Sequence, residues 1–264
     1  MITFVIIAVL IFLTIKYITF WQGMDLTDIY RDKPIFFGHR GDRYNVSENT
    51  IASFSSAIQK GLSAIELDVM LTKDDRLVCS HNFDLECETN GTGFIDEVDY
   101  QDLEKVKTGR QFSISKQETI PLLLDVSASL PNTVLINIEI KTQSTLDLKA
   151  IIKVAQLIKS GKISQKVIVS SFNPLAVRSV KLISKSIPTG FIYRNAKNFI
   201  GVFIARPDCL HPEAELITDK LIKFCRKRNM RINTWTVNNV YTRDWLISKN
   251  IDGIITDFPS LAKN

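Results

Sequence analysis

The sequence predicts an α/β barrel, in which strands and helices alternate along the chain and the strands close into a ring. Beyond residue 33, short apolar runs typical of strands alternate with longer amphipathic runs typical of helices, as in a parallel sheet covered by helices. A chain of 264 residues has room for one such domain, because a barrel of eight strand–helix units takes about 250 residues. The fingerprint of the open alternative, G-x-G-x-x-G after the first strand, is missing.

The expected elements follow from periodicity and from the residues that end them. Amphipathic runs repeat their apolar residues at helical spacing, and Gly61 and Gly161 stand where two helices should stop. The number of units approaches eight, which favours closure into a (β/α)₈ barrel. The expected strands are residues 34–39, 64–71, 134–140, 166–172, 188–194, 231–237 and 252–257, and the expected helices are residues 49–61, 147–162, 173–186, 218–229 and 243–250.

The chain begins with an almost wholly apolar stretch, ITFVIIAVLIFLTI, which continues beyond Lys16 to Trp21. Twenty helical residues span about 30 Å, the thickness of the hydrocarbon core of a bilayer. No basic residue precedes the stretch and no small-x-small cleavage site follows it, which argues against a cleaved signal peptide. We therefore expect one uncleaved transmembrane helix within residues 1–22, a linker over residues 23–33 and the barrel over residues 34–264.

The basic residues near this stretch predict its orientation. Lys16, Arg31 and Lys33 follow the apolar core and nothing basic precedes it, so the positive-inside rule places the barrel in the cytoplasm.

Charge and cysteine content narrow the function classes. The net charge is +5, from 33 basic and 28 acidic residues, without a long basic run, so the sequence gives no support to nucleic-acid binding. The excess is compatible with an anionic membrane surface or a phosphate-bearing ligand. The four cysteines lack the spacing of a zinc site and favour a reducing compartment.

Two carboxylates stand out within the expected strand 64–71. Glu66 and Asp68 are two residues apart, so both point to the same side of that strand. Carboxylates on one face repel each other and resist burial, so a positive charge must compensate them. A hard divalent cation does this best, because Mg²⁺ and Ca²⁺ prefer oxygen ligands. The alternative, an edge strand with two solvated acids, is disfavoured by the apolar residues on both sides.

Other polar residues fall at the C-terminal ends of expected strands, where barrels carry their catalytic groups. Two of the three histidines are among them, and their convergence with carboxylates indicates acid–base chemistry. Two members have a second interpretation, since Trp235 suits a core position equally well and Asp257 suits a loop cap. The residues at these positions are His39, Arg40, Glu48, His81, Glu139, Lys141, Trp235, Asn238 and Asp257.

These motifs together resemble the glycerophosphodiester phosphodiesterase family. The resemblance runs from about Phe37 to Pro259, in the order that the family shows. It implies a (β/α)₈ barrel that hydrolyses phosphodiesters of glycerol with one divalent cation, Mg²⁺ or Ca²⁺. The strings that carry it are HRGDRYNVSENTIASFSSAIQKG, IELDVMLTKDDRLVCSHN, NGTG, LINIEIK, SSFNP, TWTVN and DGIITDFP.

The resemblance also implies roles for the residues that match. One departure is Asn82, since the family usually has His-Asp where this chain has His81-Asn82. An amide still forms hydrogen bonds but supplies no charge to raise the basicity of the histidine. By resemblance, Glu66, Asp68 and Glu139 would ligate the cation, His39 and His81 would be the acid–base pair, Arg40 and Lys141 would contact the phosphate, Trp235 would line the glycerol side, and Glu48 would be a further ligand or would orient His39.

The expected activity is hydrolysis of a glycerophosphodiester to an alcohol and glycerol 3-phosphate or a lysophosphatidate-like product. The substrate is a small molecule, either a deacylated phospholipid or a lysophospholipid, and the expected anchor favours lipid-derived substrates. Two alternatives remain. A phospholipase C- or D-like enzyme on intact membrane lipids is disfavoured by the complete set of motifs, and a phosphodiester-binding barrel with impaired catalysis is supported by Asn82 alone. The head group and the oligomeric state are left open.

Overall fold

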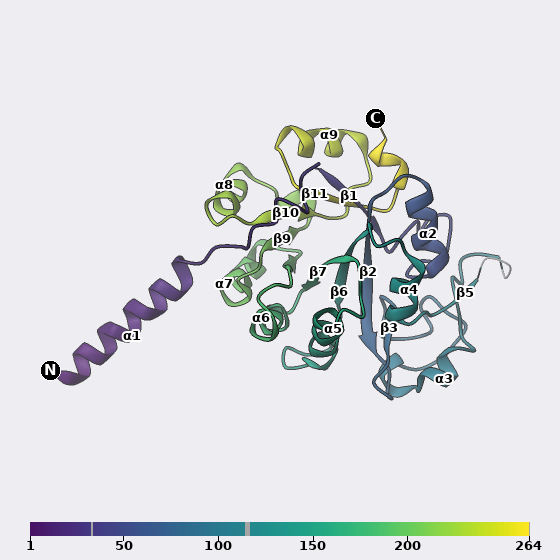
Figure 1. The fold of residues 1–264 in the computed structure, drawn as a ribbon, viewed down its shortest axis with the longest axis horizontal. Helices are drawn as coiled ribbons and strands as arrows, with labels where there is room; N and C mark the ends of the chain where they lie inside the picture. Colours follow the sequence, from purple (N-terminus) through teal and green to yellow (C-terminus); the bar gives the residue numbers. More distant parts are fainter. Residues whose placement is uncertain (33, 114–116, 264) are drawn as a thin grey trace.

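Eight parallel strands close into a barrel in the structure, a computed structural model that describes residues 1–32, 34–113 and 117–263 (Figure 1). Lys33, which contributed to the expected orientation, and Asn264, the end of the expected barrel, lie outside the described residues. The barrel strands are β1 (Ile35–His39), β2 (Ala64–Leu71), β6 (Leu135–Ile140), β7 (Lys166–Ser171), β8 (Thr189–Tyr193), β9 (Cys209–Pro212), β10 (Arg231–Thr234) and β11 (Gly253–Thr256).

The barrel closes because β1 pairs with both β2 and β11. Gly38 lies opposite Thr256 on one side, and His39 lies opposite Glu66 on the other. The short strand β3 (Leu77–Cys79) continues the sheet antiparallel to β2, while β4 (Lys107–Thr108) and β5 (Glu118–Thr119) form a separate pair. The predicted α/β barrel is therefore confirmed.

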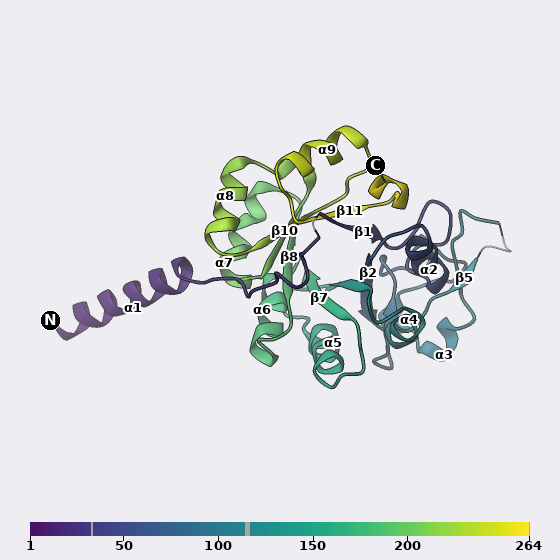
Figure 2. The ribbon, with the colours of Figure 1, turned by 45° about the horizontal axis from the view of Figure 1, so that its top comes forward.

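Helices surround the barrel (Figure 2). Side chains of Thr50, Asn173, Thr218 and Asn239 accept hydrogen bonds from backbone N–H groups in the first turns of four helices and so fix where those helices begin. The helices are α2 (Ile51–Gln59), α3 (Tyr100–Leu103), α4 (Leu123–Ser129), α5 (Lys149–Lys159), α6 (Pro174–Ile183), α7 (Val202–Ala205), α8 (Asp219–Lys227) and α9 (Val240–Ser248).

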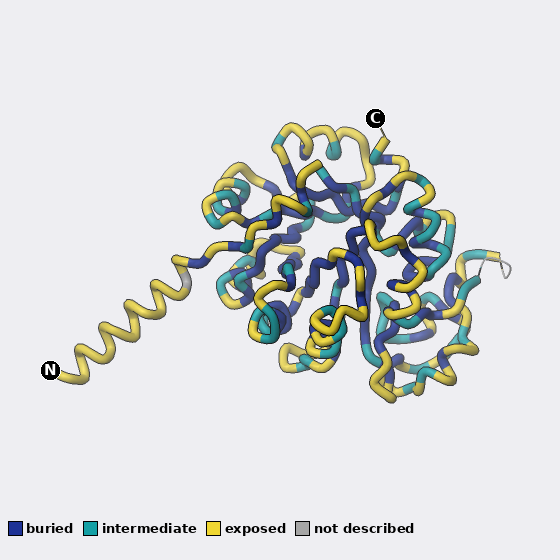
Figure 3. The backbone as a smooth tube through the Cα atoms, viewed as in Figure 1, coloured by how far each residue is buried: buried dark blue, intermediate teal, exposed yellow. Residues whose placement is uncertain are grey.

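The main core lies between the strands and the surrounding helices, so that the strands are buried and the outer helix faces are exposed (Figure 3). On β2, Ile65, Leu67 and Val69 are fully buried in this layer. Because side chains alternate along a strand, Glu66 and Asp68 point to the inside of the barrel.

The barrel strand that the sequence analysis omitted is β9, and the short strands β3, β4 and β5 outside the barrel were omitted as well. Strand β9 has only four residues, it contains His211, and it ends at Pro212, so neither alternation nor a long apolar run marks it. The helices α3, α4 and α7 were omitted because none of them exceeds two turns, which is too short for a helical repeat to show.

Residues 21–30 close the N-terminal end of the barrel. Leu26 and Tyr30 are buried, and they pack in one cluster with Ile35, Cys209 and other residues of the strands. The Tyr30 hydroxyl donates a hydrogen bond of 3.0 Å to the side-chain oxygen of Asn233 inside the barrel. This segment therefore belongs to the folded core, and the opposite, C-terminal end of the barrel stays open for the site.

The N-terminal helix α1 (Ile2–Thr19) projects away from the barrel (Figure 1), and its side chains are exposed as far as Tyr17. Its 18 residues rise about 27 Å, less than the roughly 30 Å of a bilayer core, and Lys16 lies in its last turn. Within the described part of the chain, no helix has both the length and the apolar character needed to cross a membrane. The expected transmembrane helix is therefore not supported.

Candidate active site

A central pocket of about 190 Å³ opens at the C-terminal ends of the strands. Its position agrees with the location of active sites in (β/α)₈ barrels. It is lined by seven of the residues that the sequence analysis selected: His39, Arg40, Glu66, His81, Glu139, Lys141 and Trp235.

Three carboxylates converge at this pocket, and we call Glu66, Asp68 and Glu139 the acidic cluster. Each offers an oxygen that lies within 4.8 Å of those from the other two. Glu66 and Asp68 extend from β2, and Glu139 on β6 lies opposite Asp68 in the strand register. Hard cations such as Mg²⁺ and Ca²⁺ take such carboxylate oxygens as ligands, so the donor set fits the expected cation.

Burial and neighbouring charges shift the pKa values of the three carboxylates in the acidic cluster. Burial raises the pKa of Glu66 well above its usual value, and the neighbouring carboxylates Asp68 and Glu139 raise it further. Burial also raises the pKa of Glu139, against the opposing effect of Lys141. Burial acts on Asp68 in the same direction, but Arg40 and Lys141 outweigh it and lower its pKa. A bound cation would relieve this repulsion by favouring the ionised form of all three side chains.

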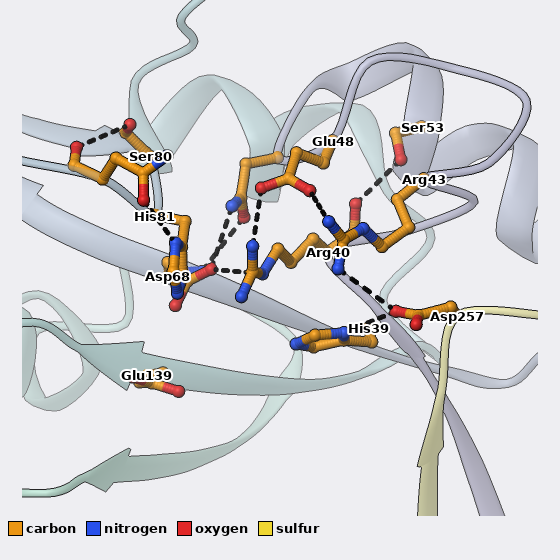
Figure 4. Close-up of polar contacts among 12 residues, drawn as sticks. His39, Arg40, Arg43, Glu48, Ser53, Asp68, Ser80, His81, Glu139 and Asp257 are labelled. Carbon is orange, nitrogen blue, oxygen red and sulfur yellow. Dashed lines mark hydrogen bonds and ion pairs between the residues drawn. The ribbon is translucent and has the colours of Figure 1, made fainter. Parts of the chain in front are cut away.

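Two cationic side chains, Arg40 and Lys141, flank the acidic cluster, and Figure 4 shows Arg40 beside Asp68. The Nε atom of Arg40 lies 3.2 Å from a carboxylate oxygen of Asp68. The Nζ atom of Lys141 lies 3.1 Å from a carboxylate oxygen of Glu139 and 3.6 Å from one of Asp68. Both cations also line the central pocket, so they are placed to bind an anion that enters it.

Arg40 is held in place by its backbone as well as by its charge. Its φ of 55° lies in the left-handed region, which is unfavourable for a residue with a side chain. The backbone N–H of Arg40 donates a hydrogen bond of 3.1 Å to the carboxylate of Glu66, and Ser53 donates one of 2.8 Å to its carbonyl oxygen. These bonds fix the turn that directs the guanidinium across the acidic cluster.

Glu48 lies between two guanidinium groups. Its carboxylate oxygens are each 2.7 Å from a nitrogen, one of Arg40 and one of Arg43. It does not belong to the acidic cluster, and among the described contacts it makes none with His39. The contacts of Glu48 therefore differ from the two expected roles, metal ligand or partner of His39, and position the two arginines instead. The sequence analysis did not select Arg43.

Asp257 is the partner of His39, not a loop cap. Its carboxylate lies 2.6 Å from Nδ1 of His39 (Figure 4). It accepts a second hydrogen bond of 2.6 Å from Asn238. Burial raises the pKa of Asp257, but the hydrogen bonds with His39 and Asn238 and the charges of His39 and Arg43 together outweigh it and lower the value to about 2, so the carboxylate is ionised. An ionised partner at Nδ1 leaves Nε2 of His39 as the nitrogen that can exchange a proton with a substrate.

His81 has a neutral partner in the same position. Its Nδ1 lies 2.8 Å from the side-chain oxygen of Asn82. Burial lowers the pKa of His81 to about 4, and the hydrogen bond with Asn82 opposes this only weakly. Burial lowers the pKa of His39 as well, against the effect of Asp257. The two histidines therefore face one pocket with different partners, one charged and one neutral.

Aromatic and basic side chains form the remaining wall of the pocket. Trp235 lines it, with Phe172 edge-on at 5.6 Å between ring centroids and the guanidinium of Arg194 at 5.5 Å from the ring centre. The indole N–H of Trp235 donates a hydrogen bond of 2.9 Å to the backbone oxygen of His211. Trp235 therefore borders the site, although a core position was equally expected. Phe172, Arg194 and His211 were missed, and only their places at or near strand ends could have indicated them.

The fold and the site together define the class of protein. A (β/α)₈ barrel presents an acidic cluster, two histidines and two cations at one pocket at the C-terminal ends of its strands, an arrangement that suits a hydrolase of phosphoric diesters.

Comparison with known proteins identifies the family. The family model described as "Glycerophosphoryl diester phosphodiesterase family" matches residues 39–261. A glycerophosphodiester phosphodiesterase of Caldanaerobacter subterraneus subsp. tengcongensis is 34% identical over 236 residues, which cover 88% of this chain and 97% of that protein. The chain therefore belongs to the glycerophosphoryl diester phosphodiesterase family and is a phosphoric diester hydrolase, which confirms the resemblance seen in the sequence.

Solved structures share the fold of this chain. A phosphodiesterase of Oleispira antarctica, in complex with the product sn-glycerol-3-phosphate, superposes with a TM-score of 0.78 at 24% identity, covering 87% of this chain and 95% of that one. A glycerophosphodiester phosphodiesterase of Thermotoga maritima superposes with a TM-score of 0.71 at 27% identity, covering 86% and 96%.

The contact between His39 and Asp257 yields a testable prediction. Asp257→Asn keeps the shape of the side chain but removes the negative charge that stabilises a protonated His39. We expect kcat to fall by about 10²- to 10⁴-fold with little change in KM, measured by steady-state kinetics. The matched control is Asp244→Asn on the exposed face of α9, which should retain full activity. An unchanged kcat in Asp257→Asn would show that this pair does not assist catalysis.

Proposed function

We propose that this chain hydrolyses glycerophosphodiesters with one divalent cation, Mg²⁺ or Ca²⁺, held by the acidic cluster. The observation that carries the proposal is the convergence of three carboxylates beside two histidines in one pocket. When bound, the cation would neutralise and polarise the phosphate of the substrate.

Arg40 and Lys141 bind the non-bridging phosphate oxygens in this proposal. Both line the central pocket, and both already lie within about 4 Å of the acidic cluster. Arginine can contact two oxygens at once through its planar guanidinium, whereas lysine acts as a point charge. Glu48 and Arg43 keep the guanidinium of Arg40 in position.

The two histidines divide the proton transfers. His81, whose pKa burial lowers to about 4, is neutral near pH 7 and takes the proton of the attacking hydroxyl. His39 is the acid: ionised Asp257 at Nδ1 opposes the effect of burial and stabilises the imidazolium, which protonates the departing alcohol as its bond to phosphorus breaks. The nucleophile is the glycerol hydroxyl next to the phosphate, which forms a cyclic phosphate. Water then opens that ring with the two histidines in exchanged roles.

The products are an alcohol and glycerol 3-phosphate, or a lysophosphatidate-like product when the substrate retains one acyl chain. The bound product of the Oleispira antarctica phosphodiesterase, sn-glycerol-3-phosphate, supports a glycerophosphodiester substrate for a barrel of this shape. Trp235 borders the pocket and would contact the glycerol unit.

Metal removal and substrate choice test the proposal. The full chain should release choline from glycerophosphocholine with Mg²⁺ or Ca²⁺, and a chelator should lower the rate by more than about 100-fold, reversibly. Glu66→Gln removes one charged ligand and should have a comparable effect. Glu97→Gln, at an exposed position, is the matched control. Full activity in the presence of chelator would refute the metal, and no release from deacylated or monoacylated substrates would refute the activity.

The neutral partner of His81 gives a prediction for pH dependence. Asn82→Asp places a carboxylate at Nδ1, stabilises the imidazolium and should raise the pKa of His81 by about one unit. Because His81 acts in its neutral form, the acidic limb of kcat/KM should move to higher pH by the same amount, while the rate above that limb increases. The control is Asn250→Asp, at the other end of the barrel. An acidic limb that does not move would show that His81 is not the base.

We also propose that α1 attaches the protein to a membrane, with the barrel on the cytoplasmic side. The support is the exposure of its apolar side chains, such as Ile7 and Ile11, together with the basic residues Lys16 and Arg31 that follow them. An apolar helix of this kind gains free energy when it enters lipid.

Vesicle flotation tests this attachment. The full chain should float with vesicles that contain anionic lipid, and the double variant Ile7→Glu, Ile11→Glu should remain in the dense fraction. Leu182→Glu introduces the same charge at an exposed site on the barrel and should float normally. Equal flotation of the double variant would refute the attachment, and cleavage of the barrel by protease added outside intact cells would refute the orientation.

A further inference from the structure

A second cavity lies outside the barrel, near the mouth of the central pocket. We call it the outer groove. It has a volume of about 420 Å³ and lies between the 3₁₀ helix η3 (Ala196–Gly201) and α8. Its apolar lining consists of Tyr193, Ala196, Phe199, Leu216, Leu221 and Phe224, and polar residues complete it.

Packed aromatic rings hold the outer groove open. The ring centroids of Phe199 and Phe224 are 5.1 Å apart, and those of Phe199 and Tyr193 are 6.0 Å apart. The guanidinium of Arg228 lies 4.0 Å from the ring centre of Phe224. The walls are therefore fixed by mutual packing, and a ligand would not have to create the cavity.

The outer groove and the central pocket share a wall at the end of β8. Successive residues there alternate between the two cavities: Ile192 and Arg194 line the central pocket, while Tyr193 lines the outer groove. A second connection joins the segment after β9 to the glycerol side of the site, because the N–H of Ala214 donates a hydrogen bond of 2.8 Å to the backbone oxygen of Trp235. The end of β8 therefore separates the two cavities by the width of one strand.

Arg194 lies at the boundary between the two cavities, since it lines the central pocket and directly follows Tyr193 of the outer groove. It is exposed, and its guanidinium lies over the ring of Trp235 at 5.5 Å. In the part of the chain that the structure describes, no hydrogen bond or ion pair engages it. Its N–H donors can therefore bind an ester carbonyl or a glycerol hydroxyl at the rim.

We propose that the outer groove binds the single acyl chain of a monoacylated glycerophosphodiester while its phosphate lies at the acidic cluster. This inference rests on the proposed function and assigns its substrate class. The occupant follows from the position of the groove next to the central pocket, across the end of β8, and from chemistry, because the pocket holds charged and polar groups and the groove offers an apolar surface beside them. A deacylated substrate would use the pocket alone.

The test varies the acyl chain at a constant head group. The full chain is assayed with 1-acyl-glycerophosphocholines from hexanoyl to dodecanoyl, below their micellar concentrations, and with glycerophosphocholine. Each methylene that enters an apolar site strengthens binding by up to about fourfold, so kcat/KM should rise with chain length until the groove is filled.

Filling the groove should remove this rise without disturbing the site. Ala196→Trp places a large side chain in the groove and deletes none of its packing, so it should lower kcat/KM for the dodecanoyl substrate more than tenfold and leave glycerophosphocholine unaffected. Asn198→Trp adds the same side chain at an exposed residue of η3 that does not line the groove, and it should behave as wild type. Both variants retain α1, so acyl binding by that helix affects them equally.

The outcomes separate the groove from the activity. Acyl-chain binding by the outer groove would be overturned if Ala196→Trp and Asn198→Trp showed the same dependence on chain length. It would also be overturned by turnover of glycerophosphocholine without turnover of any acylated substrate, a result that leaves the proposed function standing. If no substrate is hydrolysed, the proposed function fails. Calorimetric titration with the dodecanoyl compound then tests whether the outer groove binds the acyl chain. Binding lost only in Ala196→Trp supports it, and equal binding in both variants overturns it.

Discussion

The repulsion among three buried carboxylates is the constraint on which the rest of the site depends. Glu66 and Asp68 are almost fully buried, and Glu139 shares their pocket, so their charges must be compensated nearby. Arg40 compensates part of the charge, and its left-handed backbone is stabilised by a hydrogen bond to Glu66 itself. The first strand, the turn after it and the second strand thus form one electrostatic unit. A divalent cation would complete the compensation.

The two histidines illustrate how one pocket can support both an acid and a base. Burial lowers the pKa of both rings and so favours their neutral form. The two histidines differ in the partner at Nδ1. The carboxylate of Asp257 favours the protonated state of His39, whereas the amide of Asn82 only orients His81. Asn82 therefore fits the proposed role of His81 as a base that is neutral near pH 7, and it does not by itself indicate a barrel that has lost catalysis.

Features that depend on local periodicity were predictable from the sequence. Glu66 and Asp68 were placed correctly because strand geometry directs alternate residues to one side, and the barrel followed from alternation of strands and helices. The pairing of His39 with Asp257 joins residues 218 positions apart and depends on ring closure between β1 and β11. Closure itself was expected, so placing the last strand beside the first would have brought Asp257 to His39. The short strand β9 had no comparable signal.

The N-terminal end of the barrel carries α1 and the C-terminal end carries the site, and this arrangement affects the route by which a lipid-derived substrate would reach the site. Residues 21–30 close the N-terminal end, and α1 leaves from there, with the ring of Tyr17 under the guanidinium of Arg206 at the end of α7. The segment η3–α7 then runs from the mouth of the site to that contact, since η3 begins just after β8 ends. If α1 lies in lipid, this side of the barrel is the one nearest the membrane (Figure 2). The outer groove is on that same side, so an acyl chain would pass from lipid to groove without crossing the opposite face of the barrel.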